Sequence, residues 1–308
     1  MAKIVVTGGA GFIGSHVVDR LIEAGHSVAV IDNLSSGRRE NLDAKARLIE
    51  MDMASPSLAE TLAEESPDAV IHLAAQIDVR QSLMDPAFDA NTNIVGSLNL
   101  LEACVKAKVR KFVYASTGGA VYGEPAILPA SEETPILPLC HYGVSKYTVE
   151  QYTRLYKVLY GMDYTVLRFP NVYGPRQSHT GEAGVCAILI GLMLAGKRPT
   201  LYGHGAPLRD YVYAGDIARG CVLALTKGDG ETVNLGSGKG TSVRELFDVL
   251  AELLGYSGEP DLQPLRAGEI DKSYITGERA ARVLGWRPEV ALREGLRRTA
   301  EHVRGAMG

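Results

Sequence analysis

The chain has few cysteines, no long apolar run and no excess of basic residues. Its cysteines, among 308 residues, are Cys104, Cys140, Cys186 and Cys221. Their wide and irregular spacing fits neither a zinc site nor a disulfide framework, so we expect free thiols in a reducing cytoplasm and no metal. The net charge of −4 excludes a basic footprint for nucleic acid. The longest apolar stretch, 185–195, is shorter than the ~20 residues that span a membrane, so no membrane partner is expected.

Short apolar runs alternate with helical patterns through the first half of the chain. The predicted strands are 3–7, 27–31, 48–51, 69–73, 111–116 and 164–169, and the predicted helices between them are 12–24, 91–107 and 141–159. Such alternation is typical of a parallel sheet with helices on both faces. We therefore predict an α/β protein with a Rossmann-type doubly wound parallel sheet.

The pattern loosens after Pro170, where prolines and glycines become frequent. Helices are predicted at 185–195, 216–226, 242–254, 278–284 and 292–304, and a strand at 232–235. We predict that residues 1–170 form a dinucleotide-binding domain, rejoined by about 211–236. The rest of 171–308 would form a smaller α/β substrate-binding domain.

A glycine-rich loop joins the first predicted strand to the first predicted helix. It contains Gly8, Gly11 and Gly14, and Phe12 and Ile13 open the helix. Glycines there allow a pyrophosphate to approach backbone N–H groups, and the helix N-terminus favours a negative charge. Because the loop lies between a strand and a helix, we expect it to bind a dinucleotide.

An acidic residue, Asp32, ends the second predicted strand. A carboxylate at this point accepts hydrogen bonds from the adenosine ribose and repels a 2′-phosphate, which favours NAD over NADP. Arg38 and Arg39 lie nearby and are interpreted as a solvated loop. Further residues at or beyond strand ends are expected beside the cofactor: Asn33, Asp52, Met53, Leu73, Ala74 and Ala75.

Tyr142 and Lys146 lie four residues apart in a predicted helix, so their side chains share one face. A nearby cation lowers the pKa of a tyrosine from its reference value of roughly 10. Such a tyrosine can act as an acid and a base near neutral pH. Taken alone, the pair could equally be an ordinary helix surface.

Together with the glycine loop, Asp32, the 73–75 segment and Asn93, this pair resembles the extended short-chain dehydrogenase/reductase family. Within that family, the chain is most similar to the UDP-glucose 4-epimerase subgroup. The resemblance implies bound NAD, a nucleotide-diphosphate sugar substrate with uracil favoured, and C4 epimerisation through a transient 4-keto sugar. It also implies a homodimer in which the helices 91–107 and 141–159 pair across the interface.

The second half of the chain carries segments that resemble the substrate-binding segments of that family. The residues implied to bind the nucleotide sugar are Asn171, Gly184, Val185, Thr200, Leu201, Tyr202, Arg209, Arg266, Glu269 and Ser273, and Phe169 is implied to border the cofactor. Asn171, Arg209 and Arg266 would hold the diphosphate. Taken singly, Asn171 could cap a turn, and Arg209 could form an internal ion pair with Asp210. Ser273 is small, so an N-acetyl group at the sugar C2 is expected to fit.

The chain departs from the family pattern at one position. In that family a Ser or Thr usually lies four residues before the tyrosine of a Val-Tyr-Gly step, which here is 121–123. Gly118 stands at that position, so we predict that Thr117 supplies the hydroxyl, with Ser116 as the alternative. The absence of a carboxylate at 118–120 argues against the related dehydratases and decarboxylases, which need an additional acid or base. His141 is expected to pack at the start of its helix without a catalytic role.

Two other functions stay open from the sequence. One is another NAD-dependent nucleotide-sugar epimerase or a reductase of the same family. The other is a non-catalytic NAD-binding protein, in which Tyr142 and Lys146 would be idle.

Overall fold

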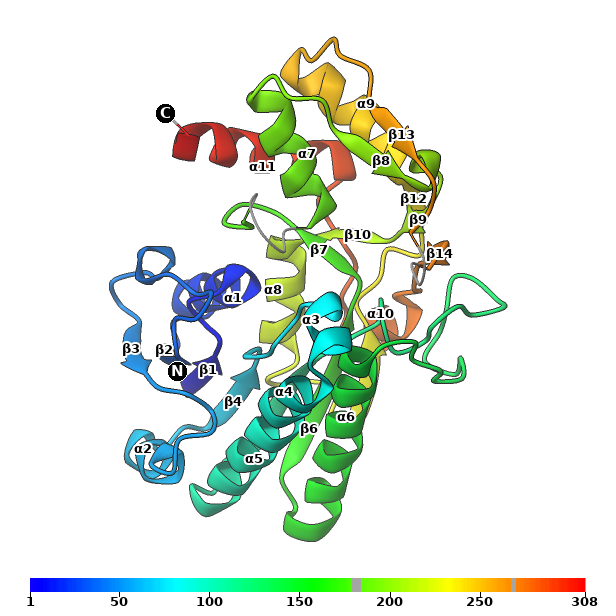
Figure 1. The fold of residues 1–308 in the computed structure, drawn as a ribbon. Helices are drawn as coiled ribbons and strands as arrows, with labels where there is room; N and C mark the ends of the chain where they lie inside the picture. Colours follow the sequence, from blue (N-terminus) through cyan, green and yellow to red (C-terminus); the bar gives the residue numbers. More distant parts are fainter. Residues whose placement is uncertain (179–183, 267–269, 308) are drawn as a thin grey trace.

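A seven-stranded parallel sheet forms the centre of the protein, as the computed structural model shows for the described residues 1–178, 184–266 and 270–307 (Figure 1). Its strands are β1 (Lys3–Thr7), β2 (Ser27–Asp32), β3 (Arg47–Glu50), β4 (Ala69–His72), β5 (Lys111–Thr117), β6 (Asp163–Phe169) and β11 (Glu231–Asn234). Their order is β11-β6-β5-β4-β1-β2-β3, and every neighbouring pair is parallel. The carboxyl ends of the strands therefore share one edge of the sheet, where ligands of such folds bind.

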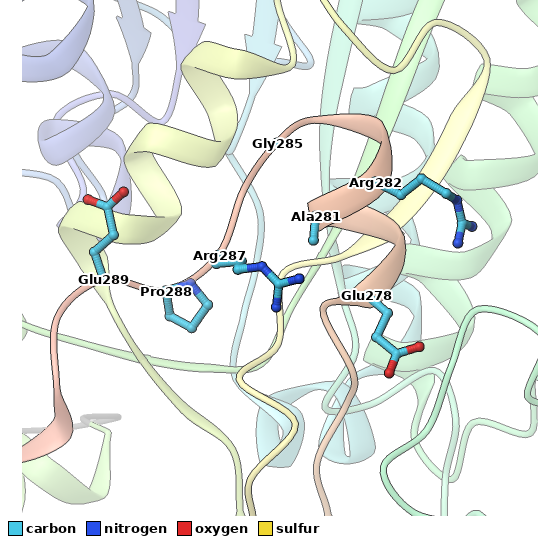
Figure 2. A pocket seen from close by; sticks show the side chains of 7 residues that line it. All are labelled: Glu278, Ala281, Arg282, Gly285, Arg287, Pro288 and Glu289. Carbon is cyan, nitrogen blue, oxygen red and sulfur yellow. The ribbon is translucent and has the colours of Figure 1, made fainter.

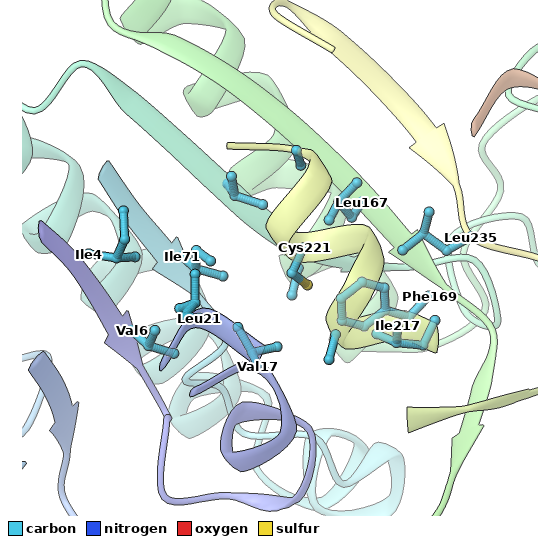
Figure 3. Close-up of a cluster of buried hydrophobic side chains, with 14 of the residues drawn as sticks. Ile4, Val6, Val17, Leu21, Ile71, Leu167, Phe169, Ile217, Cys221 and Leu235 are labelled. Atoms are coloured by element: carbon cyan, nitrogen blue, oxygen red, sulfur yellow. The ribbon is translucent and has the colours of Figure 1, made fainter. Parts of the chain in front are cut away.

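The sheet is buried on both faces because its strands are apolar on both sides. On β1, Ile4 and Val6 point into one core, and Val5 points into the other. Helices α1 (Phe12–Glu23) and α8 (Ala214–Leu223) supply residues to the first core, including Val17, Leu21, Ile217 and Cys221 (Figure 3).

Helices α2 (Leu58–Glu65), α5 (Gly96–Lys106) and α6 (His141–Tyr160) cover the opposite face. Leu58, Leu62, Leu100 and Val149 pack there against Phe112 and other sheet residues. Short helices α3 (Val79–Met84) and α4 (Pro86–Ala90) precede α5, and a π-helical turn, η2 (Asn91–Val95), joins α4 to α5. The doubly wound α/β fold predicted from the sequence is confirmed.

A separate apolar cluster lies beyond the sheet, where Figure 1 shows α7 (Val185–Leu194), α9 (Val243–Leu254) and α11 (Leu292–Met307). Helix α9 begins with a capping box, because Ser242 accepts from the Glu245 backbone and Glu245 accepts from the Ser242 backbone. The remaining short strands are β7 (Asn171–Tyr173), β8 (Thr200–Tyr202), β9 (Leu208–Arg209), β10 (Tyr211–Tyr213), β12 (Thr241–Ser242), β13 (Asp261–Gln263) and β14 (Lys272–Ser273). The remaining helical elements are α10 (Glu278–Val283) and the 3-10 turns η1 (Arg39–Asn41) and η3 (Gly203–Gly205).

Several segments after residue 170 return to the central sheet. β11 pairs with β6, α8 packs on α1, and Trp286 is fully buried in the core that these helices share. Trp286 also donates a hydrogen bond from Nε1 to the Asp216 carbonyl at 2.8 Å. The division of the chain into two domains stays a prediction.

Helices α2, α3 and α4 and the short strands after β6 are absent from the predicted elements. Their apolar patterns are too short to separate from loops, since β9, β12 and β14 have two residues each. Among the described residues, no helix combines the length and apolar character needed to cross a bilayer.

Candidate active site

The glycine loop forms a close backbone turn between β1 and α1. A Cβ on Gly8 would lie 2.7 Å from the Ala74 nitrogen, and a Cβ on Gly14 would lie 2.0 Å from the Gly8 oxygen. Gly8 also has a φ of +68°, which glycine adopts without steric cost. Gly11 is the N-cap of α1, and its helix start carries no side-chain cap. The helix N-terminus, begun by Phe12 and Ile13, is thus suited to a phosphate group.

Asp32 fixes this loop from the end of β2. Its carboxylate accepts hydrogen bonds from the backbone nitrogens of Ala10 and Leu34, each at 2.9 Å, and it is largely buried. A carboxylate accepts about four hydrogen bonds, so two positions stay available for ribose hydroxyls. Asn33 donates to Asp52 at 2.7 Å beside it, which joins the ends of β2 and β3.

The segment after β4 is held from two sides. The Leu73 nitrogen donates to the Thr7 carbonyl at 3.1 Å, and the Ala74 nitrogen donates to the Thr7 hydroxyl at 3.3 Å. Ala74 and Ala75 are therefore placed against the glycine loop and present little side-chain bulk. The Met53 carbonyl accepts a hydrogen bond from Asn99 at 2.6 Å, which ties the segment after β3 to α5.

Asn93 is a buried residue of η2 whose amide holds the chain just past Ala75. Its Oδ1 accepts from the Gln76 nitrogen and its Nδ2 donates to the Gln76 carbonyl, both at 2.9 Å. The same Nδ2 also donates to Asp89 at 3.0 Å. The amide of Asn93 thus fixes the course of the backbone at the carboxyl end of β4, where the cofactor was expected.

Tyr142 and Lys146 lie on the first turns of α6, as the helical spacing predicted. Lys146 is only 4% exposed, and its Nζ lies 4.5 Å from the centre of the Tyr114 ring. Tyr142 is half-buried, and the Thr117 side chain at the end of β5 lies close enough to its phenol to lower its pKa. A tyrosine, a threonine hydroxyl and a buried lysine therefore lie at the carboxyl edge of the sheet.

Burial dominates the protonation of both residues. It lowers the pKa of Lys146 to about 7, while the charges of Glu150 and Asp89 act in the opposite direction. Burial also raises the pKa of Tyr142, with further contributions from Cys140 and Asp89, and the hydrogen bond to Thr117 opposes the rise. The lowered tyrosine pKa expected from the sequence is not produced by the protein groups alone.

Ser116, the alternative hydroxyl, faces a different set of partners. It is 3% exposed and donates to Glu150, which also receives two bonds from Arg168 at 2.9 and 2.6 Å. Arg168 donates in turn to the Tyr122 hydroxyl at 2.7 Å. Ser116 thus belongs to a buried ion-pair network, whereas the Thr117 side chain acts on the pKa of Tyr142.

The glycine at position 118 has a packing reason. A Cβ on Gly118 would lie 2.4 Å from Cδ1 of Ile275, a fully buried side chain, so a serine or threonine cannot fit without displacement. A Cβ on the next residue, Gly119, would lie 3.8 Å from both Thr117 Oγ1 and Asn171 Oδ1. Gly119 thus lies beside both the Thr117 hydroxyl and the Asn171 amide, which the sequence had assigned to the substrate.

A small hollow beside β7 brings three predicted substrate residues together. Asn171, Gly184 and Val185 line it, with Tyr211 and Gln177 among the other lining residues. Among the described residues, neither Tyr211 Oη nor Gln177 Oε1 has a hydrogen-bond partner, although both atoms are buried. Buried polar atoms without partners are unusual and fit a polar ligand. Neither residue was predicted, and only the neighbouring Arg-Asp-Tyr and Pro-Arg-Gln steps could have suggested them.

The other predicted substrate residues lie on neighbouring strands, with mixed orientations. Arg266 stacks on the Tyr202 ring at 3.5 Å, and Arg209 pairs with Ser273 in register across β9 and β14. Thr200 is half-buried, whereas the Leu201 side chain is fully buried in the α7–α9–α11 cluster, so only its backbone can border a ligand. Glu269 lies outside the described residues.

Arg209 and Asp210 do not form the internal ion pair that the sequence left open. Arg209 donates to the carbonyls of Leu208 and Ile270, at 2.9 and 2.6 Å. Asp210 is buried and accepts from Ser237, and burial raises the pKa of its carboxyl to about 6. The Asn171 nitrogen donates to the Asp210 carbonyl at 2.9 Å, which ties β7 to the segment that carries Arg209.

Two expectations from the sequence change. His141 is exposed and does not pack at the helix start; Cys140 caps that turn, with its sulfur accepting from the Gly143 nitrogen at 3.4 Å. The Phe169 side chain lies in the core shared by α1 and α8, so only its backbone can border the cofactor.

A second hollow lies on α10 and the following loop, away from these residues. Figure 2 shows its lining side chains: Glu278, Ala281, Arg282, Gly285, Arg287, Pro288 and Glu289. None of them belongs to a motif. Within the described ranges, no cluster of His, Cys, Asp and Glu side chains has the composition to hold a metal ion.

Comparisons with known proteins agree with this arrangement. Residues 4–236 match the model of the NAD dependent epimerase/dehydratase family. A putative UDP-glucose 4-epimerase of Methanocaldococcus jannaschii is 46% identical over 295 residues, which cover 96% of each chain. The crystal structure of UDP-glucose 4-epimerase from Thermotoga maritima with UDP-glucose superposes with a TM-score of 0.97 at 47% identity, covering 99% of this chain and 100% of that one. The Thermus thermophilus UDP-glucose 4-epimerase, in complex with NAD, has a TM-score of 0.93 at 42% identity, covering 99% of each chain.

Proposed function

This chain belongs to the NAD dependent epimerase/dehydratase family, and from that premise we propose which of its residues carry the reaction. The family resemblance drawn from the sequence motifs is confirmed. The protein epimerises a UDP-sugar at C4 and uses NAD. The observation that supports our assignment of residues is the group formed by Thr117, Tyr142 and Lys146 at the carboxyl edge of the sheet.

The glycine loop and Asp32 would hold NAD across the strand ends. The loop offers backbone N–H groups and the start of α1 to the pyrophosphate, and Asp32 accepts from the ribose. Lys146 would bind the nicotinamide ribose. When bound, NAD supplies a site that takes up a hydride from the sugar C4 and gives it back.

Tyr142 would move the proton of the sugar O4. It takes that proton as C4 is oxidised and returns it to the same oxygen as C4 is reduced on its other face, so protons and electrons balance over one turnover. The Thr117 hydroxyl would hold O4 and the phenolic oxygen together. Because burial raises the pKa of Tyr142 in the protein alone, the positive charge of Lys146 and of the bound cofactor is needed to stabilise the phenolate.

The nucleotide would be held by the strands after β6. Asn171, Arg209 and Arg266 are placed to bind the diphosphate, and Tyr211 and Gln177 would supply hydrogen bonds from the hollow beside β7. Holding the nucleotide end leaves the sugar able to turn over, which presents both faces of C4 to the same reacting groups. Uracil would lie against the β8 segment, near Tyr202.

The test is incubation with UDP-galactose, followed by separation of the sugar products and measurement of reduced nicotinamide by absorbance. An epimerase forms UDP-glucose with no net formation of reduced nicotinamide. Tyr142→Phe should retain its bound NAD and lose turnover. A reductase would instead consume reduced cofactor in step with product. Unchanged turnover in Tyr142→Phe would remove the tyrosine from the mechanism.

We also propose that N-acetylated UDP-sugars are accepted. Ser273 is the register partner of Arg209, which we assign to the diphosphate, and its small side chain would leave room for a C2 substituent of the sugar. Turnover of UDP-galactose without detectable turnover of UDP-GlcNAc or UDP-GalNAc would contradict this proposal.

A homodimer is proposed on the face formed by α3, α4 and α6. Val144, Leu155 and Val158 are exposed and lie along one side of α6, because their spacings of eleven and three residues bring them within about 60° around the helix. Met84 and Phe88, on the neighbouring short helices, are exposed as well. Exposed apolar side chains that gather on one helix and its neighbours are typical of an interface. We further propose a cytoplasmic role in galactose metabolism for the dimer.

A further inference from the structure

Asp89, on α4, is a fully buried carboxylate without an ion-pair partner among the described residues. Its hydrogen-bond donors are neutral: Gln76 Nε2 at 3.1 Å, Asn93 Nδ2 at 3.0 Å and Ser145 Oγ at 2.6 Å. An isolated buried charge is costly, so a carboxylate in this position needs a compensating positive charge nearby. No sequence motif singled out Asp89, and the reaction as assigned above does not use it.

The compensating charge is that of Lys146. Ser145, which donates to Asp89, directly precedes Lys146 in α6, and the charge of Asp89 acts on the lysine. Glu150 has the larger effect on the pKa of Lys146, but Glu150 already forms a two-bond ion pair with Arg168. Of the two carboxylates that act on Lys146, Asp89 is therefore the one without an ion pair to another described residue.

We propose that Asp89 is a positioning residue of the reaction site, whose buried negative charge keeps Lys146 in its ammonium form and whose bond to Ser145 fixes the first turns of α6. The charge of Asp89 also acts on Tyr142, which lies three residues before Ser145 on the same helix. The proposal rests on the proposed function for its kinetic readout, and on the titration of Tyr142 for a readout that needs no turnover.

The other titratable groups that face Lys146 stay neutral around neutral pH. His72, on β4, lies between the hydroxyls of Thr7 and Ser97 at 2.6 and 2.9 Å, and burial lowers its pKa to about 3. Burial raises the pKa of Tyr114, on β5, well above its ordinary value.

The other groups that face Tyr142 are also neutral around neutral pH. Burial raises the pKa of the Cys140 thiol, so it is neutral as well, and Thr117 carries no charge. Tyr114 is again the neighbour from β5. Asp89 is therefore the unmatched charge that acts on both members of the Tyr142–Lys146 pair.

The sign of the effect follows from this geometry. A nearby negative charge disfavours the phenolate and favours the ammonium, so Asp89 raises the pKa of both Tyr142 and Lys146. Turnover requires Tyr142 to lose its proton and Lys146 to keep its own. Removing the charge should therefore move the acid limb and the alkaline limb of the rate profile together toward lower pH, by about one pH unit each.

The experiment compares Asp89→Asn and Asp89→Ser with the wild-type holoenzyme. The two replacements differ in size but remove the same charge, so both should give the same displacement. Asp85→Asn is the matched control, because Asp85 is an exposed carboxylate of the same segment and its role as cap of α4 is one that asparagine also fills. Ser145→Ala removes the hydrogen bond and leaves the charge, so it should lower the rate without moving the limbs.

Two readouts are taken for each variant. The first is kcat against pH with a UDP-sugar. The second is the titration of Tyr142, measured as the tyrosinate absorbance of the variant minus that of the same variant with Tyr142→Phe added. A lower Tyr142 pKa in both Asp89 variants, with both kinetic limbs displaced to acid, supports the proposal. If the two limbs of the rate profile and the Tyr142 titration of the Asp89 variants coincide with those of Asp85→Asn, the proposal is overturned, even when the rate is reduced. If no UDP-sugar is turned over by the wild type, the proposed function fails, and the absorbance titration still decides the role of Asp89.

Discussion

Thr117→Val is the sharpest test of the assigned reaction site. The substitution keeps the branched shape at the end of β5 and removes the hydroxyl that is placed to form a hydrogen bond with the Tyr142 phenolate. A hydrogen bond to a charged group contributes about 1.5–3 kcal/mol, so losing it from the phenolate should reduce kcat roughly 10- to 150-fold. Because that bond lowers the pKa of Tyr142, its removal raises the pKa by about one to two units. The acid limb of the rate profile should therefore move to higher pH.

Ser116→Ala is the control for this experiment. Ser116 is the preceding residue of β5, but its hydroxyl donates to Glu150, and Glu150 keeps its two bonds from Arg168 when Ser116 is lost. We expect turnover within a few-fold of wild type and an unmoved acid limb. The assay is initial-rate product formation from UDP-galactose across the pH range. Wild-type rates in Thr117→Val, together with loss of turnover in Ser116→Ala, would refute the reasoning.

Three further predictions concern the cofactor, the substrate and the assembly. Gly14→Ala places a Cβ 2.0 Å from the Gly8 oxygen, so the purified protein should lose most of its bound NAD, and an unchanged NAD content would count against the loop as the pyrophosphate site. Ser273→Tyr should abolish turnover of UDP-GlcNAc and spare UDP-galactose, since a bulky ring fills the space beside the sugar C2; equal loss of both activities would reject Ser273 as the discriminating residue. Val158→Glu puts a charge on the exposed apolar side of α6 and should yield a monomer by light scattering, whereas a persistent dimer would place the interface elsewhere.

The segments expected to bind the cofactor could be located from the sequence because each of them is defined by local geometry. The glycine loop and Asp32 each sit at the carboxyl end of a predicted strand, and parallel strands bring those ends to one edge. Tyr142 and Lys146 share a helix face because their spacing is one helical turn. The departure at Gly118 was also visible in the sequence, although its cause was not.

The sequence by itself determined the alternation of strands and helices, the loop, and the spacing of the reacting pair, since these depend on neighbours within a few residues. Only the tertiary structure decided that Ile275 fills the space beside Gly118, that Thr117 and not Ser116 meets Tyr142, and that Asp89 lies buried beside α6. These contacts join residues separated by 25 to more than 150 positions. No local pattern encodes such contacts, because burial and pairing at that range are set by how the helices and the sheet pack together.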